Sequence, residues 1–403
     1  MNSFVYVVCG SIEHIETLNF SLKFMNYFSL FPVLVITDNK RNEIAIEHNT
    51  IINIDTPPNL DNHQASIYLK TSIHKYLNFS ENNSYCYIDS DVIAINSGIN
   101  TIFNKYKSPI TFAKDHCLMN EFSPYAINCN CLSDQLRKNK KFGEINAFFK
   151  QLFGERYKEN SLDRILLNAE FDKMKKHYYK NSLNLLVYIL NRYVIPQKQF
   201  KFKNYYFDKK KCFWYTKSNE IFHFDYKHFE KKIQESTGIF FDKKTRVWKD
   251  INNEIISPQT PNCHHLIEHI SQKYHQQIPS DWQHWNGGVF LFNKESFEFL
   301  DFWHKITIHE FNNSYTKTRD QGTLAVSAWR FGLQHHPTLS DEYNFITEFN
   351  NPKISYKHNF GFTKDGFIST FNPNFLHIFH EWGHDGWSIW DYVMELGKKN
   401  NIL

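Results

Sequence analysis

The pattern of apolar and polar residues divides the first part of the chain into alternating strands and helices. Short apolar runs predict strands at 4–9, 32–37, 51–55 and 85–88. Apolar residues at helical spacing predict helices at 15–28 and 64–77. The order strand, helix, strand, strand, helix, strand with short links predicts an α/β fold with a mainly parallel sheet.

A different pattern covers the middle of the chain. Apolar residues recur at helical spacing over 132–193, without a strong strand pattern, and a hairpin or small meander is predicted within 240–256. We therefore predict a large, mostly helical insertion at 116–280, between two parts of one α/β core, 1–115 and 281–403.

The α/β pattern resumes after the insertion. A Gly-Gly turn leads into a buried strand that ends at Asn293, and helices are predicted at 295–311 and 319–329. A strand that begins at Phe375 and ends at His377, before a histidine-rich turn, and a last helix at about 389–399 complete the predicted core.

Composition and charge narrow the class of protein. The formal net charge of +4 is too small to indicate a nucleic-acid partner, but it is compatible with an anionic substrate or weak attraction to a membrane surface. Seven cysteines without a CxxC pair are typical of free thiols in a reducing compartment. The chain enters a strand at once, and its longest apolar run, 183–195, is too short to span a bilayer. We expect a cytoplasmic protein, and contact with the inner face of a membrane stays open.

Two carboxylates follow the predicted strand 85–88. Asp89 and Asp91 are two positions apart, so in an extended chain both side chains face the same way. Ligands bind at the carboxyl ends of parallel strands, and two carboxylates there suit Mg²⁺ or Mn²⁺ with a phosphorylated substrate. The alternative interpretation is a solvated turn after a strand.

Three later segments carry further candidate residues. Asn286, Gly287 and Gly288 precede a buried strand, where glycines let the backbone approach a ligand, although a tight start of the strand would use them equally well. Asp320 and Gln321 open a helix, where Asp is also a strong capping residue. The late strand leads into a histidine-rich turn with His377 and His380, which could hold a metal such as zinc or lie in the core.

Five motifs in this order resemble the GT-A nucleotide-sugar glycosyltransferases, especially the family 8-like group: Asp89-Ser90-Asp91, Asn286-Gly287-Gly288-Val289, Asp320-Gln321, Leu339…Tyr343-Asn344 and the late histidines. The resemblance covers about 1–115 and 280–390. It implies a GT-A fold, Rossmann-like with a mainly parallel sheet, and a metal-dependent hexosyltransferase that uses Mn²⁺ (or Mg²⁺). The implied donor is a nucleotide-diphosphate sugar, and the implied acceptor is a glycan, a lipid-linked acceptor or another hydroxyl acceptor.

The resemblance also implies a role for each candidate. Asp91 would bind the metal directly, Asp89 would bind the metal or the ribose, and His377 or His380 would complete the coordination. Asn286, Gly287 and Gly288 would line the floor of the sugar site. Asp320 and Gln321 would contact the transferred sugar at the catalytic centre. The nucleotide would be held by Cys9, Gly10, Ser11, Asp38 and Lys70. The insertion at 116–280 would shape the acceptor site.

Two other functions stay open. Asp-x-Asp after an apolar strand is also the signature of haloacid-dehalogenase-like phosphatases, in which Asp89 would be the nucleophile and Asp91 the acid and base. An inactive GT-A domain that binds carbohydrate is the second alternative. For the transferase, the resemblance implies retention of anomeric configuration, whereas an inverting enzyme would need Asp320 or Glu381 as a base.

Overall fold

The computed structural model describes residues 2–80, 83–158, 161–242, 244–245, 247–256, 261–317, 319–348, 354–358, 361–364, 367–368, 372–379 and 382–403. The chain forms two compact units. Unit 1 comprises Met1–Leu132, Asn262–Lys364 and Ile368–Leu403, and unit 2 comprises Ser133–Pro261 with Asp365–Phe367. Unit 2 is shorter than the predicted insertion, because both flanks of that insertion pack within unit 1.

Unit 1 contains a six-stranded sheet in the order β3-β2-β1-β4-β13-β6. Its strands are β1 (Asn2–Val7), β2 (Val33–Thr37), β3 (Ile51–Asn53), β4 (Ser84–Ile88), β6 (Thr111–Leu118) and β13 (Gln283–Phe292). β13 is antiparallel to both of its neighbours, while β1 to β4 are mutually parallel, so five of the six strands run the same way. The predicted α/β class with a mainly parallel sheet is confirmed, but the antiparallel strand inside it was not predicted.

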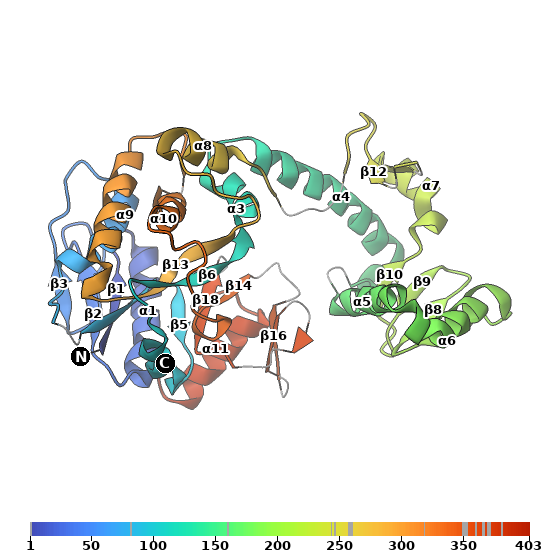
Figure 1. Ribbon diagram of the computed structural model, residues 1–403. Helices are drawn as coiled ribbons and strands as arrows, with labels where there is room; N and C mark the ends of the chain where they lie inside the picture. The colour runs from blue at the N-terminus through green and yellow to red at the C-terminus, as the bar shows by residue number, and fades with distance from the viewer. Residues whose placement is uncertain are drawn as a thin grey trace. The chain divides into compact units, whose positions relative to one another are not determined.

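Helices cover both faces of this sheet, as Figure 1 shows. Unit 1 includes α1 (Ile12–Phe28), α2 (Asn62–Thr71), α3 (Met119–Ala126), α8 (His265–Tyr274), α9 (Phe297–Glu310), α10 (Arg319–Arg330) and α11 (Ser388–Lys399). Val5 and Val7 of β1 face the core beneath α2, α3, α8, α9 and α10, whereas Phe4 and Tyr6 face the core beneath α1. This two-residue alternation is that of a strand buried on both faces.

A smaller sheet completes the part of unit 1 that holds the candidate site. It has the order β14-β18-β5 and consists of β5 (Val92–Ala94), β14 (Phe345–Glu348) and β18 (Phe375–Phe379). β18 is antiparallel to β5, with His377 opposite Val92. His377 therefore lies in the middle of its strand and not at the strand's end, where the sequence predicted it.

Unit 2 combines helices with a sheet of its own. Its helices are α4 (Cys131–Phe153), whose first two residues belong to unit 1, α5 (Leu162–Lys176), α6 (Tyr178–Ile189) and α7 (Tyr226–Thr237). A four-stranded antiparallel sheet has the order β10-β9-β8-β7, with β7 (Gln199–Phe202), β8 (Tyr205–Asp208), β9 (Phe213–Tyr215) and β10 (Ile221–Phe224). Phe149 of α4 stacks on Phe224 with a centroid distance of 3.8 Å, at the centre of one of its cores.

The prediction of a mostly helical insertion missed this sheet, because its strands have only three or four residues each. The predicted hairpin is present as β11 (Phe240–Asp242) and β12 (Val247–Lys249). No helix among the described residues is long and apolar enough to cross a membrane.

Glu310 is a buried carboxylate at the end of α9. Its oxygens receive hydrogen bonds from Asn313 (2.8 Å) and from the hydroxyl of Tyr274, and they pair with Lys273 Nζ at 2.6 Å. Burial alone would raise the pKa of Glu310, but His269, Lys273 and the hydrogen-bond donors outweigh burial and hold that pKa below its usual range. This ionised group links α8 to α9 within unit 1.

Candidate functional site

Asp89 and Asp91 occupy the short connection between β4 and β5. The backbone N–H of Asp89 donates to the carbonyl of Gly288 in β13 at 2.8 Å. The backbone N–H of Ile378 in β18 donates to the carbonyl of Asp91 at 3.0 Å. Two neighbouring strands thus fix the backbone on which both carboxylates are mounted.

His377 joins the two carboxylates. Its Nε2 lies 3.5 Å from Asp91 Oδ1, and its Nδ1 lies 2.9 Å from Asn344 Oδ1. Because an amide oxygen only accepts, Nδ1 carries the proton and Nε2 is the nitrogen that faces the carboxylates. Ligand atoms of Asp89, Asp91 and His377 lie within 4.8 Å of one another, as around one cation. His380, the other predicted ligand, lies outside the described residues.

The three side chains differ in charge and exposure. Burial raises the pKa of Asp89, and Asp91 adds to that effect while Lys70 opposes it. Burial would also raise the pKa of Asp91, but the pairing with His377 outweighs it and lowers that pKa. Burial opposes the charge on His377, yet Asp91 raises the pKa of His377 above its usual value. The side chains of Asp89 and Asp91 stay 28% and 37% exposed, so a solvated ion can reach them.

Lys70 of α2 lies between two carboxylates from distant segments. Its Nζ is 3.5 Å from Asp89 and 3.1 Å from Asp320, and its side chain is 9% exposed. Burial disfavours the charged amine, but the two carboxylates outweigh burial and raise the pKa of Lys70. Tyr87 donates its hydroxyl to Asp89, and its ring lies 5.2 Å from Lys70 Nζ. The candidate site therefore contains a buried cation beside its acidic groups.

The backbone of β13 is distorted where it passes these groups. Asn286 pairs with Ala113 of β6 and Phe290 pairs with Phe112, so three residues of β13 have no counterpart in β6. Such a bulge changes the direction in which the side chains of the strand point, and bulges are common next to binding sites. Asn286 Oδ1 accepts from the backbone N–H of Gly288 at 2.8 Å and holds the bulge closed.

Gly288 lies at the closest approach of β13 to the acidic cluster. A Cβ atom there would be 2.7 Å from Cε1 of His377, 2.9 Å from Oδ1 of Asn286 and 3.0 Å from Oδ2 of Asp89. A residue without a side chain is thus needed so that β13 can support the site.

Asp320 and Gln321, at the start of α10, lie beside the bulge. The amide oxygen of Gln321 accepts from the backbone N–H of Gly287 at 3.3 Å, and its nitrogen donates to the carbonyl of Trp285 at 3.3 Å. The carbonyl of Asp320 accepts from the indole of Trp303 at 2.9 Å. α10 is therefore anchored to β13 and α9, and the structure brings Asp320, Gln321 and Gly287 next to Lys70.

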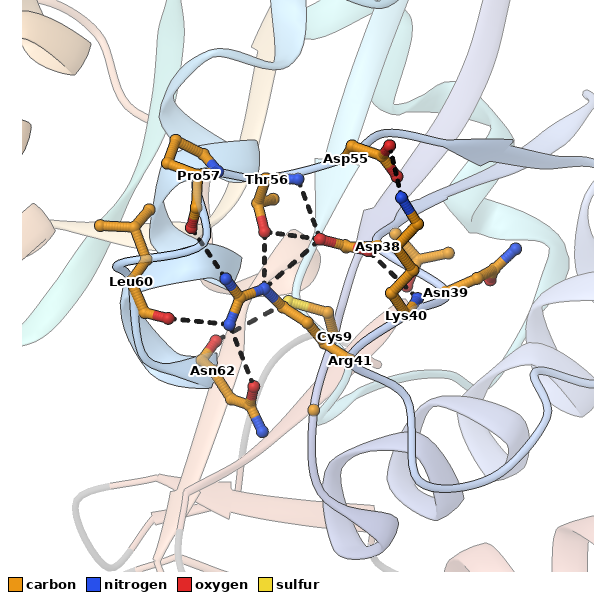
Figure 2. A network of polar contacts seen from close by, with 12 residues as sticks. Cys9, Asp38, Asn39, Lys40, Arg41, Asp55, Thr56, Pro57, Leu60 and Asn62 are labelled. Atoms are coloured by element: carbon orange, nitrogen blue, oxygen red, sulfur yellow. Dashed lines mark hydrogen bonds and ion pairs between the residues drawn. The ribbon is translucent and has the colours of Figure 1, made fainter.

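The predicted nucleotide residues of the first two strands lie in a separate network of polar contacts, part of which Figure 2 shows. Asp38 follows β2, is buried, and accepts from the backbone N–H and the hydroxyl of Thr56 at 2.9 and 2.6 Å. Arg41 lies 3.3 Å from Asp38 and donates to the carbonyls of Pro57 and Leu60 at 2.8 Å each. Asp38 thus joins the loops after β2 and β3, and its role toward a nucleotide stays a prediction.

Cys9, Gly10 and Ser11 form the turn from β1 into α1. Cys9 Sγ lies 3.3 Å from the hydroxyl of Ser66 in α2, and burial raises the pKa of that thiol. Gly10 has a φ of +115°, a conformation that side chains rarely adopt, and its N–H donates to Asn42 at 3.3 Å. The turn lies against α2, the helix that also carries Lys70.

Several residues of the candidate site were not predicted from the sequence. Tyr87 counted only as a residue of the predicted strand 85–88, and Asn344 belonged to a motif of the resemblance without an assigned role. Asp115 of β6 pairs with His116 at 2.8 Å and accepts from Asn286 at 3.2 Å. Burial would raise the pKa of Asp115, but His116 and its other partners lower it. An Asp two residues after the mostly apolar segment 110–113 was the signal that could have identified it.

Comparisons with known proteins do not identify the family of this chain. No family model matches the sequence, and no curated protein matches it. Among solved structures, the apo form of mouse xyloside xylosyltransferase 1 is 8% identical, with a TM-score of 0.36 over 94% of this chain and 97% of that chain. A similarity this low says nothing about activity, which has to be inferred from the candidate site itself.

Proposed function

We propose that the protein is a metal-dependent glycosyltransferase that transfers a sugar from a nucleotide-diphosphate sugar to a glycan or other hydroxyl acceptor. The observation that carries the proposal is the cluster of Asp89, Asp91 and His377 at the carboxyl end of β4, with ligand atoms within 4.8 Å of one another. This is the edge at which α/β sheets bind ligands.

The chemistry of the three ligands fits Mn²⁺ or Mg²⁺. Asp89 and Asp91 supply hard oxygen ligands, and His377 offers a nitrogen whose orientation Asn344 fixes. Both carboxylates are partly exposed, which leaves positions for water and for phosphate oxygens. A bound divalent ion would offset the charge that develops on the departing nucleotide diphosphate.

The surrounding residues support binding of a polar, anionic donor. Lys70 supplies a buried positive charge, and the bulge at Gly287 and Gly288 brings backbone close to the carboxylates. Asp320 lies 3.1 Å from Lys70 Nζ, so its carboxylate is already engaged in an ion pair. We therefore propose that Asp320 orients the sugar and that the enzyme retains the anomeric configuration.

Proton NMR of the product tests the stereochemistry. An α-linked donor should give an α-linked product with a small anomeric coupling. A β-linked product would mean inversion and would make Asp320 or Glu381 the base.

Substitution of a proposed metal ligand tests the function. Asp91→Asn should abolish Mn²⁺-dependent hydrolysis of nucleotide sugars and transfer from them, while Asp55→Asn, which changes an exposed ion pair, serves as the matched control. If Asp91→Asn keeps more than about a tenth of the wild-type rate, about 1.4 kcal/mol of barrier, the metal assignment is wrong.

The same assays separate the alternatives. A phosphatase with Asp89 as nucleophile would hydrolyse p-nitrophenyl phosphate and form an aspartyl phosphate, yet Asp89 is engaged by Lys70 and by the hydroxyl of Tyr87. An inactive domain would bind a nucleotide sugar without turnover in the presence of Mn²⁺.

We further propose that unit 2 contributes to acceptor binding. A pocket of about 460 Å³ within unit 2 is lined by aromatic and charged side chains, among them Trp214, Trp248, Arg192 and Asp225. Aromatic faces beside a few polar groups suit a saccharide. Trp248→Ala should raise the acceptor KM and leave nucleotide affinity unchanged, whereas Tyr179→Ala, an exposed substitution in the same unit, should change neither. A loss of nucleotide affinity in folded Trp248→Ala would contradict this assignment.

A further inference from the structure

Unit 1 contains a second group of metal-ligating side chains, built from residues that the proposed transferase does not use. Cys129 and Cys131 lie at the end of its first chain segment, and Cys263 and His265 lie at the start of its second. One ligand atom from each of the four residues lies within 4.8 Å of the other three. Two pairs of ligands more than a hundred residues apart in sequence therefore meet at one point.

The distances within the group match a tetrahedral zinc site. Cys129 Sγ and Cys263 Sγ are 3.9 Å apart, and Cys131 Sγ is 3.6 Å from Nδ1 of His265. Zn–S bonds of about 2.3 Å and Zn–N bonds of about 2.0–2.1 Å give tetrahedral edges of about 3.8 Å for S···S and about 3.6 Å for S···N. A disulfide would need the two sulfurs at about 2.05 Å, so the separation fits shared coordination and not a bond.

The backbone around the ligands is fixed by hydrogen bonds. The N–H of Cys129 donates to Ile127 at 2.9 Å, and the N–H of Cys263 donates to Asn120 at 2.9 Å. Cys131 and His265 are the first residues of α4 and α8, so helical geometry sets the direction of their side chains. The ligands are thus held by defined elements.

Ser123 gives Cys263 a supporting contact of the kind that metal ligands have. Its hydroxyl is buried in α3, accepts from a backbone N–H of α8 at 2.9 Å, and lies 3.1 Å from Cys263 Sγ. A metal-bound thiolate has no proton, so toward such a sulfur the Ser123 hydroxyl would be the donor. A buried hydrogen-bond donor beside the sulfur is the kind of outer partner that orients a metal ligand.

We propose that Cys129, Cys131, Cys263 and His265 bind one Zn²⁺ ion in a closed, structural site. Three thiolates and one imidazole fill the four positions of tetrahedral zinc and leave none for a substrate, which distinguishes this site from the open Asp89 cluster. The ion would clamp the two positions at which the chain leaves unit 1 for unit 2 and returns from it.

Metal analysis of the purified full-length protein, in reducing buffer with a weak chelator, tests the proposal. We expect about one zinc per chain in the wild type and in Asp91→Asn, because the latter change affects only the other site. Cys263→Ser and His265→Ala should lose at least nine tenths of the zinc, whereas His265→Cys should retain it. Cys212→Ser, which alters a partly buried thiol outside the group, should retain it too.

A second measurement uses the native protein and does not depend on how a variant folds. Stepwise modification of thiols by p-hydroxymercuribenzoate, followed with a colorimetric zinc indicator, should release the zinc as three thiols react together. Co²⁺ exchanged into the site should show thiolate charge-transfer bands and the strong visible bands of a tetrahedral ion. Folded wild-type protein without zinc, iron in place of zinc, or a disulfide between Cys129 and Cys263 would each overturn the proposal.

Discussion

Gly288→Ala offers a test of the proposed metal site that does not depend on knowing the substrate. The added Cβ would lie 2.7 Å from Cε1 of His377 and 3.0 Å from Oδ2 of Asp89, whereas ordinary contacts begin at 3.4 Å. Relief of the closer contact requires a shift of about 0.7 Å, although metal–ligand distances tolerate only about 0.2 Å. His377 has little freedom to move, because it is buried within β18 and bonded to Asn344.

We expect Gly288→Ala to weaken Mn²⁺ binding about 10- to 100-fold, the usual effect of misorienting a metal ligand, which is about 1.4–2.8 kcal/mol. The electron paramagnetic resonance signal of free Mn²⁺ measures the dissociation constant directly. Gly143→Ala is the matched control, because no atom outside its own helix lies within 4 Å of the Cβ it would add. The thermal unfolding curve of each variant separates a local effect from loss of the fold.

A double-mutant cycle makes the reasoning refutable. In a His377→Ala background the closest contact of the new Cβ is gone, so Gly288→Ala should cost less there than in the wild type. Equal costs in both backgrounds would mean that the substitution does not act through His377. Unchanged Mn²⁺ affinity in folded Gly288→Ala would remove the cluster from consideration as a metal site.

Three further substitutions test other parts of the structure. Lys70→Met removes the cation between two carboxylates and should lower the free energy of unfolding by about 2 kcal/mol, less than the roughly 3–5 kcal/mol expected for breaking a fully buried pair. Denaturant titration measures this free energy, and Lys75→Met, which changes an exposed ion pair, is the control. Glu310→Gln should lower the free energy of unfolding by about 1–3 kcal/mol above pH ~4.3. This difference in free energy from the wild type should shrink at lower pH, because the pKa of Glu310 is depressed in the folded state and its contribution is lost when it is protonated. Phe149→Ala should destabilise unit 2 by about 3–5 kcal/mol while hydrogen exchange in unit 1 stays unchanged.

The N-terminal part of the fold could be predicted because its signals are local. The order of strands and helices over residues 2–88 follows from apolar periodicity within short windows, and the structure has that order. Periodicity carries no information on strand direction, so the antiparallel β13 between β4 and β6 could not be foreseen. The short strands of unit 2, such as β7 with Phe200 and Phe202 alternating, offered too few residues for a clear pattern.

In the candidate site, too, only the local features could be predicted from the sequence. Asp89 and Asp91 share a face because they are two residues apart, which the sequence states directly. The pairing of Lys70 with Asp320 depends on how α2 and α10 pack, and no pattern in either helix indicates it. The same is true of the proposed zinc ligands, since each pair has one residue between its members and neither resembles a usual zinc motif.

The position of β13 has a consequence for how the chain is made. β4 and β6 are complete early in synthesis, but the strand that lies between them follows roughly 200 residues after β4. At about 5–20 residues per second, a ribosome needs roughly 10–40 s to deliver it. During that interval the apolar edge of β4 has no partner on one side and is open to pairing with another chain. Until residue 292 has emerged, β4 of a nascent chain therefore presents an unpaired strand edge to neighbouring chains.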